Sequence, residues 1–323
     1  MAISEFALIE RYFRQRGVQR DDVRVGIGDD AALLDSPPGM ELVAAIDTLV
    51  AGVHFPHGSS AVSIGHRALA VNLSDLAAMG AQPAWALLAL TLPAADEAWL
   101  EDFASGFAEL AHAHQVALVG GDTTSGPLCI SLQVLGHVAR GSAMLRSGGK
   151  PGDVLFVSGT PGDSAAGLAL EQGRLSASAQ ASSFLRDRFL FPTPRVALGG
   201  RLRQFASACI DVSDGLLADA GKLAAASSSG VQIDYRSVPV SEHLVSAVGD
   251  TRARELCLTG GEDYELCFSV RPQNVGPLLR ELPPAAWGYQ RIGVLVQSPG
   301  AAVLAADASV MRFSHSGFDH FGS

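Results

Sequence analysis

Six aspartates occupy positions in the sequence that favour metal binding. Five of them end predicted strands, where a rigid sheet places functional groups on the following loop, and the sixth lies in a predicted apolar helix. Converging carboxylates repel each other unless cations lie between them, and Mg²⁺ suits oxygen ligands without a His or Cys cluster. Because Mg²⁺ held by few carboxylates usually also binds phosphate oxygens, a nucleotide or phosphate ester is indicated. The predicted metal ligands are Asp30, Asp47, Asp75, Asp122, Asp211 and Asp214.

The segment 65–83 is predicted to be the helix that carries Asp75. Its leucines recur at helical spacing and its other sides are also apolar, which is typical of a buried helix. Asn72 and Asp75 share its single polar stripe. An ionised carboxylate beside a core is costly unless it is paired or bound to metal. A helix cap or a salt bridge remains the alternative for Asp75, and a turn or cap role remains the alternative for each of the other five acids.

The other polar residues include no dedicated base and no covalent nucleophile. The sequence lacks an HExxH motif, a G-x-S-x-G elbow and a Walker-type phosphate loop. His54 is a candidate substrate contact and Arg146 a candidate phosphate contact, with a structural histidine and a surface arginine as the alternatives. Glycine-rich turns at 26–30 and 120–122 could present backbone N–H groups to phosphate.

Composition limits the class of protein. The chain has 323 residues and a mass of 33.5 kDa, which suggests two globular domains. A formal net charge of -10 argues against a nucleic-acid partner. No apolar run is long enough to span a bilayer, and the first residues do not resemble a signal peptide. Four cysteines without metal-ligand spacing indicate buried, reduced thiols, so a cytoplasmic location is expected.

Apolar runs and helical patterns alternate along the chain and predict a mixed α/β fold. In the first half, strands are expected at 41–46, 83–92 and 116–119, the last stopping at the Gly-Gly-Asp turn of 120–122, and an amphipathic helix at 96–114. A glycine-rich linker at 147–152 separates two predicted domains, 1–147 and 148–323. In the second domain, strands are expected at 206–210 and 264–270 and a helix at 216–226.

Six segments then carry a resemblance to a known family. In this order along the chain they are GIGDDAALL, AIDTLVAGVHF, ALAVNLSDLAAMGA, LVGGDTTSGP, IDVSDGLLAD and GGEDYELCF. They resemble the thiamine-monophosphate kinase family of the AIR-synthetase-like (PurM-like) ATP-binding superfamily, and the resemblance runs from Glu5 to the GFDHF tail. It implies a two-domain PurM-like fold that forms a homodimer through its N-terminal domain. It also implies ATP-dependent phosphorylation of thiamine monophosphate to thiamine diphosphate, the last step of thiamine diphosphate biosynthesis, with several Mg²⁺ ions.

The resemblance also implies roles for individual residues. The six aspartates match metal ligands of the family. The ATP contacts would be Gly121, Asp122, Arg146 and Ser213, and the contacts to the thiamine substrate would be His54, Glu262 and Phe318. One departure concerns the two positions before Asp47, where the family usually has hydroxyl residues and this chain has Ala45 and Ile46. Backbone carbonyls or water would have to replace those hydroxyls.

Two other functions fit the same sequence features. One is another ATP-using enzyme of the superfamily, such as a selenophosphate synthetase or a purine-pathway synthetase. The synthetase of selenophosphate typically needs a reactive Cys or selenocysteine near its N-terminus, whereas the first Cys here is Cys129. The other alternative is a regulatory protein that binds metal and nucleotide without turnover. Product formation would separate it from a kinase.

Overall fold

The computed structural model describes residues 5–14 and 16–318 of the chain, without the side chains of Glu5 and Phe6. The chain divides into two compact units, residues 1–76 with 81–142 and residues 77–80 with 143–323. The sequence-based boundary, between 147 and 148, lies a few residues after the point where the chain enters the second unit. Within the described residues, no helix is both long and apolar enough to cross a membrane.

The first unit contains a four-stranded sheet in the order β3-β6-β4-β5. β3 pairs antiparallel with β6, β6 antiparallel with β4, and β4 parallel with β5. A short antiparallel pair, β1 (Val23–Val25) with β2 (Leu33–Leu34), precedes this sheet. The four strands are β3 (Met40–Val50), β6 (Cys129–Ala139), β4 (Gln82–Leu92) and β5 (Ala117–Ser125).

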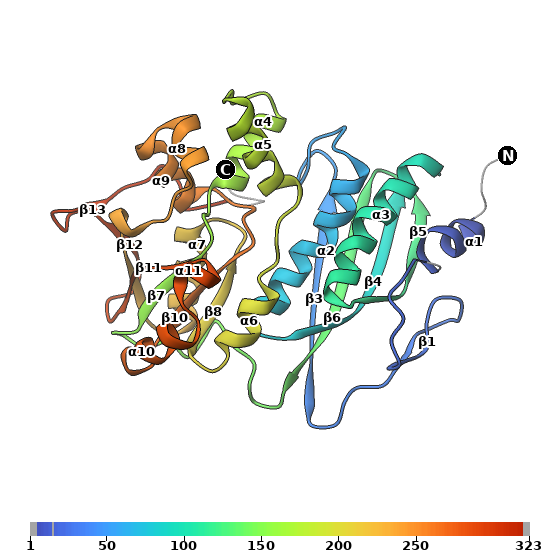
Figure 1. The fold of residues 1–323 in the computed structure, drawn as a ribbon, viewed down its shortest axis with the longest axis horizontal. Helices are drawn as coiled ribbons and strands as arrows, with labels where there is room; N and C mark the ends of the chain where they lie inside the picture. Colours follow the sequence, from blue (N-terminus) through green and yellow to red (C-terminus); the bar gives the residue numbers. More distant parts are fainter. Residues whose placement is uncertain (1–4, 15, 319–323) are drawn as a thin grey trace. The chain divides into compact units, whose positions relative to one another are not determined.

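Two long helices, α2 (Ala61–Ala78) and α3 (Glu97–His114), lie side by side on one face of this sheet (Figure 1). Two glycines permit the close approach. A Cβ on Gly65 would lie 2.1 Å from the carbonyl oxygen of Phe103, and one on Gly106 would lie 2.0 Å from that of Val62. The helix interface therefore requires glycine on both sides. The N-terminal segment consists of α1 (Glu5–Leu8) and the π-helical η1 (Ile9–Arg14).

The second unit contains a seven-stranded mixed sheet in the order β13-β12-β9-β11-β7-β10-β8. All of its neighbouring strands are antiparallel except β12 and β9. Its strands are β7 (Val154–Ser158), β8 (Ala206–Val212), β9 (Gly230–Asp234), β10 (Glu265–Val270), β11 (Tyr289–Val296), β12 (Gly300–Leu304) and β13 (Val310–Met311).

Helices of the second unit cover this sheet and complete two apolar cores. One core includes Leu216 and Leu223 of α7 and Leu258 of α9, and the other includes Leu198 of α6 and Leu278 of α10. Strands β7, β10 and β8 contribute side chains to both cores, so this part of the sheet is buried on both faces. The helices are α4 (Asp163–Glu171), α5 (Ala179–Leu190), α6 (Val196–Leu202), α7 (Leu216–Ala226), η2 (Tyr235–Ser237), α8 (Glu242–Val248), α9 (Asp250–Thr259), α10 (Pro272–Glu281) and α11 (Pro284–Trp287).

Two local predictions were wrong in the same way. The segment 120–122 is not a turn after a strand, because β5 continues through it to Ser125. Asp47 likewise lies inside β3, which continues to Val50, and not at a strand end. In both places the backbone ladder with the neighbouring strand continues through the polar residue, pairing Asp122 with Ala89 and Asp47 with Leu132.

Candidate active site

A pocket of about 1290 Å³ in the first unit brings three of the predicted residues together. Asp30 reaches it from the loop after β1, and Gly121 and Asp122 reach it from β5. The residue before Asp30 shapes that loop, because the Oδ1 atom of Asp29 accepts the N–H of Asp30 at 2.8 Å. The pocket therefore has two predicted metal ligands, and its lining also includes the apolar side chain of Ile46, which is 64% exposed.

Gly121 is required by the way β5 passes β4. Its φ is +152°, and a Cβ at this position would lie 1.8 Å from the carbonyl oxygen of Leu88. Any side chain would push β5 away from β4 at the place where Asp122 follows. The glycine thus sets the position of the neighbouring carboxylate in the pocket.

The other predicted residues of the first unit, Asp47, His54 and Asp75, are not among those that line this pocket. All three are partly buried. The Nδ1 atom of His54 accepts the backbone N–H of Val50 at 3.0 Å, so in the neutral imidazole the proton is on Nε2, which can donate. Asp75 lies on α2 as expected, between fully buried neighbours such as Ser74 and Leu76. The prediction of a buried, apolar helix is confirmed, but the helix spans 61–78 and not 65–83, since Gln82 and Pro83 already belong to β4.

Three segments of the second unit meet through backbone hydrogen bonds and bring together four predicted residues. The N–H of Glu262 donates to the carbonyl of Ser213 at 2.7 Å, and the N–H of Phe318 donates to the carbonyl of Asp214 at 2.9 Å. A Cβ on Gly317 would lie 2.6 Å from that same Asp214 oxygen, which shows how closely the tail passes the loop. The phenyl ring of Phe318 is 53% exposed and can cover a ligand.

Asp219, a residue that the sequence analysis did not identify, holds the loop that carries Ser213 and Asp214. One oxygen of the Asp219 carboxylate accepts the N–H groups of Ser213, Asp214 and Gly215 at 3.0, 2.9 and 3.2 Å. Burial raises the pKa of Asp219, and the ammonium of Lys222, at 2.8 Å from its other oxygen, opposes this. Lys222 also contacts the carboxylate of Asp214.

Asp211 and Arg146 lie apart from these hydrogen bonds in the second unit. Asp211 is buried and near the end of β8, where it pairs with Leu266 of β10. Arg146 is exposed, and its backbone carbonyl accepts the hydroxyl of Ser227, just after α7. All four cysteines are free, and Cys129 is partly exposed while the other three are buried. Burial raises the pKa of Cys267 well above its usual value, so this thiol stays protonated and unreactive.

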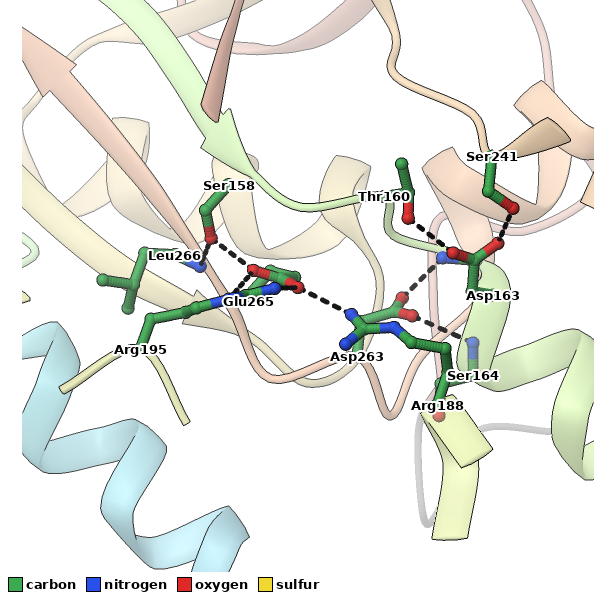
Figure 2. Close-up of polar contacts among 11 residues, drawn as sticks. Ser158, Thr160, Asp163, Ser164, Arg188, Arg195, Ser241, Asp263, Glu265 and Leu266 are labelled. Atoms are coloured by element: carbon green, nitrogen blue, oxygen red, sulfur yellow. Dashed lines mark hydrogen bonds and ion pairs between the residues drawn. The ribbon is translucent and has the colours of Figure 1, made fainter. Parts of the chain in front are cut away.

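Next to Glu262, the start of β10 contains buried carboxylates that the sequence analysis did not use (Figure 2). Glu265 is completely buried, and its oxygens accept from Arg195 at 2.6 Å, from Arg188 at 2.7 Å and from the hydroxyl of Ser158. Burial alone would raise the pKa of Glu265, but the hydrogen bond and charge of Arg195 and the charge of Arg188 outweigh it, and the pKa is lowered. An acidic residue within an apolar segment was the sequence signal that singled out Asp75, and the same signal could have identified Glu265.

Replacing Glu265 with glutamine is expected to lower the free energy of unfolding at pH 7 by roughly 3 kcal/mol, because two arginines lose their buried counter-charge. Urea unfolding measures this. The matched control is Asp250→Asn, which removes the ion pair of the exposed Asp250 with Arg254 and should cost less than about 1 kcal/mol. A Glu265→Gln variant as stable as the control would contradict the assignment.

The pH dependence of that difference is also expected. The folded-state pKa of Glu265 lies below its ordinary value of 4.5, so its stabilisation is present above that pH and is lost as the pH falls through the lowered pKa. The stability gap between the wild type and Glu265→Gln should therefore narrow below pH 4.5 and stay constant between pH 6 and 8. A gap independent of pH down to acid unfolding would show that folding does not lower the pKa of Glu265.

Sequence comparison defines the class of protein that this fold and site belong to. The family description "AIR synthase related protein, N-terminal domain" matches residues 28–138, and "AIR synthase related protein, C-terminal domain" matches residues 150–305. The two matches cover both units, with their mixed sheets. The chain is thus an α/β protein of the AIR synthase related, PurM-like class, as the sequence predicted.

Relatives with known names narrow this class. The thiamine-monophosphate kinase of Escherichia coli strain K12 is 46% identical over 324 residues, covering 100% of both chains. The crystal structure of thiamine-monophosphate kinase from Stenotrophomonas maltophilia K279a superimposes with a TM-score of 0.85 at 48% identity, covering 96% of this chain and 99% of that one. AaThiL complexed with AMPPCP and TMP gives a TM-score of 0.77 at 31% identity, covering 99% of each. The chain belongs to the thiamine-monophosphate kinase family.

Proposed function

We propose that this chain transfers the γ-phosphoryl group of ATP to thiamine monophosphate and so forms thiamine diphosphate. The carrying observation is the full-length match, 46% identical, to a thiamine-monophosphate kinase. The AaThiL complex, which contains AMPPCP and TMP, supports both substrates. A coupled assay with ATP, Mg²⁺ and thiamine monophosphate tests the proposal. Formation of ADP and thiamine diphosphate is expected, and no turnover at saturating substrates would refute it.

The proposed contacts follow the residues placed above. Glu262 faces the cationic thiazolium or the aminopyrimidine of thiamine, Phe318 covers one ring, and the Nε2–H of His54 donates to the substrate. Gly121, Asp122, Arg146 and Ser213 bind ATP. Ser213 would act through its hydroxyl, since its backbone N–H is already bound by Asp219. The exposure of the Arg146 side chain leaves its guanidinium able to bind phosphate oxygens.

The carboxylate chemistry suits Mg²⁺, which would be held by Asp30, Asp47, Asp75 and Asp122 in the first unit and by Asp211 and Asp214 in the second. Two of these line one pocket, and all six supply the oxygen ligands that this hard cation prefers. Within the described residues, no group of three or more His, Cys, Asp or Glu side chains is close enough to hold a metal ion. Phosphate oxygens of the substrates would complete the coordination. When bound, Mg²⁺ neutralises the phosphate charge that would otherwise keep the two anionic substrates apart.

The transfer is proposed to be direct and in line, without a covalent enzyme intermediate. The sequence shows no motif of a covalent nucleophile, and the six aspartates are assigned to cations. Rapid-quench experiments with γ-labelled ATP check this. A labelled enzyme species that forms and decays as fast as turnover would contradict direct transfer.

A homodimer through the first unit is also part of the proposal. One side of β3 bears exposed apolar residues in alternation, with Leu42 at 51% and Ile46 at 64% exposure. An apolar strand face of this kind is usually covered by a partner. Sedimentation should give a dimer at micromolar concentration, and a monomer there would refute it. The four free cysteines support a reducing compartment such as the cytoplasm, which cell fractionation can check.

A further inference from the structure

The turn that carries Glu262 has an unusual backbone. Glu262 has φ of +71° and Tyr264 has φ of +54°, so two residues with side chains adopt the left-handed conformation on either side of Asp263. Such conformations are unfavourable for residues other than glycine and persist where surrounding contacts impose them. The contacts around Asp263 therefore decide whether Glu262 stays in place.

On one side, Asp263 is fixed to the N-terminus of α4 (Figure 2). Its side chain is buried, with 2% exposure, and its two oxygens accept the N–H groups of Gly162 at 2.8 Å and Ser164 at 3.3 Å. The helix has no side-chain cap of its own, because its N-cap residue is Gly162. A carboxyl group from about 100 residues away in the sequence thus caps α4. Burial raises the pKa of Asp263 well above its usual value, and the N–H groups of Gly162 and Ser164 oppose this.

On the other side, the turn is fixed to the loop that contains Ser213. The N–H groups of Glu262 and Tyr264 donate to the carbonyls of Ser213 and Val212, at 2.7 and 2.8 Å. The Tyr264 hydroxyl then donates to Oε2 of Glu262 at 2.7 Å. The Glu262 carboxylate is thus oriented by a side chain whose own backbone is held by the same turn.

We propose that Asp263 is a positioning residue that holds Glu262 in the orientation needed to bind thiamine monophosphate. This rests on the proposed function, since it takes Glu262 as the thiamine contact. Asp263 does not touch the substrate. It clamps the middle of the turn to α4, so that the residues on either side of it keep their left-handed backbone conformation.

Direct binding of thiamine monophosphate, measured by calorimetry, tests the proposal in a double-mutant cycle. Asp263→Asn replaces one acceptor oxygen by an NH₂ group facing an N–H of α4, and it is expected to raise the Kd about tenfold. Glu262→Gln should raise it at least as much. Because Asp263 acts through Glu262, adding Asp263→Asn to Glu262→Gln should change the Kd less than about twofold. The Kd of an ATP analogue should stay within about twofold in all variants.

The matched control is Asp96→Asn. Asp96 also accepts two backbone N–H groups at a helix N-terminus, those of Ala98 and Trp99 in the first unit. The Asp96→Asn variant should leave the Kd values of thiamine monophosphate and of the ATP analogue unchanged. If Asp263→Asn does not fold, Asp263→Ser leaves room for a water that bridges to the α4 N–H groups, and it enters the same cycle.

Three outcomes would overturn the proposal. The increases in the Kd of thiamine monophosphate caused by Asp263→Asn and Glu262→Gln could multiply in the double variant, which would make Asp263 a general structural residue. Asp263→Asn could weaken the ATP analogue as much as thiamine monophosphate. Wild-type protein that binds no thiamine monophosphate would refute the proposed function as well, whereas wild-type binding with independent effects would refute the role of Asp263 alone.

Discussion

The Asp75→Asn substitution should lower the turnover of thiamine monophosphate at least about 10²-fold and leave the fold intact. Asparagine keeps the shape of Asp75 but loses the charge that a bound cation would neutralise. The residue lies half-buried on α2, between the fully buried Ser74 and Leu76. A structural role would give the opposite pattern, because removal of the charge would then change stability and not the rate.

The measurement compares initial rates over a range of Mg²⁺ concentrations, with thermal unfolding as a check on the fold. Asp102→Asn is the control, since Asp102 is an exposed aspartate on α3 of the same unit and should turn over normally. Normal turnover of Asp75→Asn at ordinary Mg²⁺ would show that Asp75 has a purely structural role. A rate that recovers at high Mg²⁺ would support the metal assignment.

The second large effect concerns the acceptor substrate. Thiamine, which has a free hydroxyl in place of the phosphate, should react at least about 10²-fold more slowly than thiamine monophosphate. A hydroxyl acceptor needs a base within hydrogen-bond reach, whereas a phosphate monoester with a second pKa near about 6 already offers an ionised oxygen at neutral pH. The carboxylates of this chain are assigned to cations. His54 uses Nδ1 to accept the N–H of Val50, so its neutral ring is a donor at Nε2 and not a base there.

The measurement compares initial rates with thiamine and thiamine monophosphate at matched concentrations, both below saturation and at saturation. Below saturation the ratio includes the lost binding of the phosphate, and at saturation it reports the chemical step. Comparable saturating rates would refute the mechanism without a base and the assignment of all six aspartates to metal. Replacing His54 with glutamine serves as the control, because glutamine retains an N–H donor and should preserve the preference for the phosphate.

The sequence predicted the elements whose pattern is local. The helix at 216–226 and the strand at 83–92 follow from periodicity and agree closely with α7 and β4. One of the two wrong predictions concerns the strand ladder at 120–122, where glycine signalled a turn. There glycine is needed because the backbone of Leu88 in β4 lies against Gly121, and such a contact between strands leaves no local signal.

The candidate site likewise contains features that the sequence predicted and features that it did not. Residue types at motif positions indicated the acids of both units, and the resemblance supplied their proposed roles. The contacts that hold them were not predictable, because they join positions far apart in the chain, such as Glu262 with Ser213 and Asp263 with Gly162. Asp219 is close in sequence to the loop it holds, yet it reads as an ordinary polar residue of a helix. Its three N–H partners became visible only once the loop was folded.

The contact between α2 and α3 has a consequence for protein engineering. Exchanging helical glycine for alanine is a common route to thermostability, because alanine reduces the entropy of the unfolded chain. A methyl group added to Gly200 in α6 would meet no other atom within 4 Å, so this glycine is suited to that exchange. Gly65 and Gly106 are not, since a methyl group on either would lie about 2 Å from a carbonyl oxygen of the facing helix. A library that replaces helical glycines without regard to their neighbours would therefore lose stable members at positions such as these.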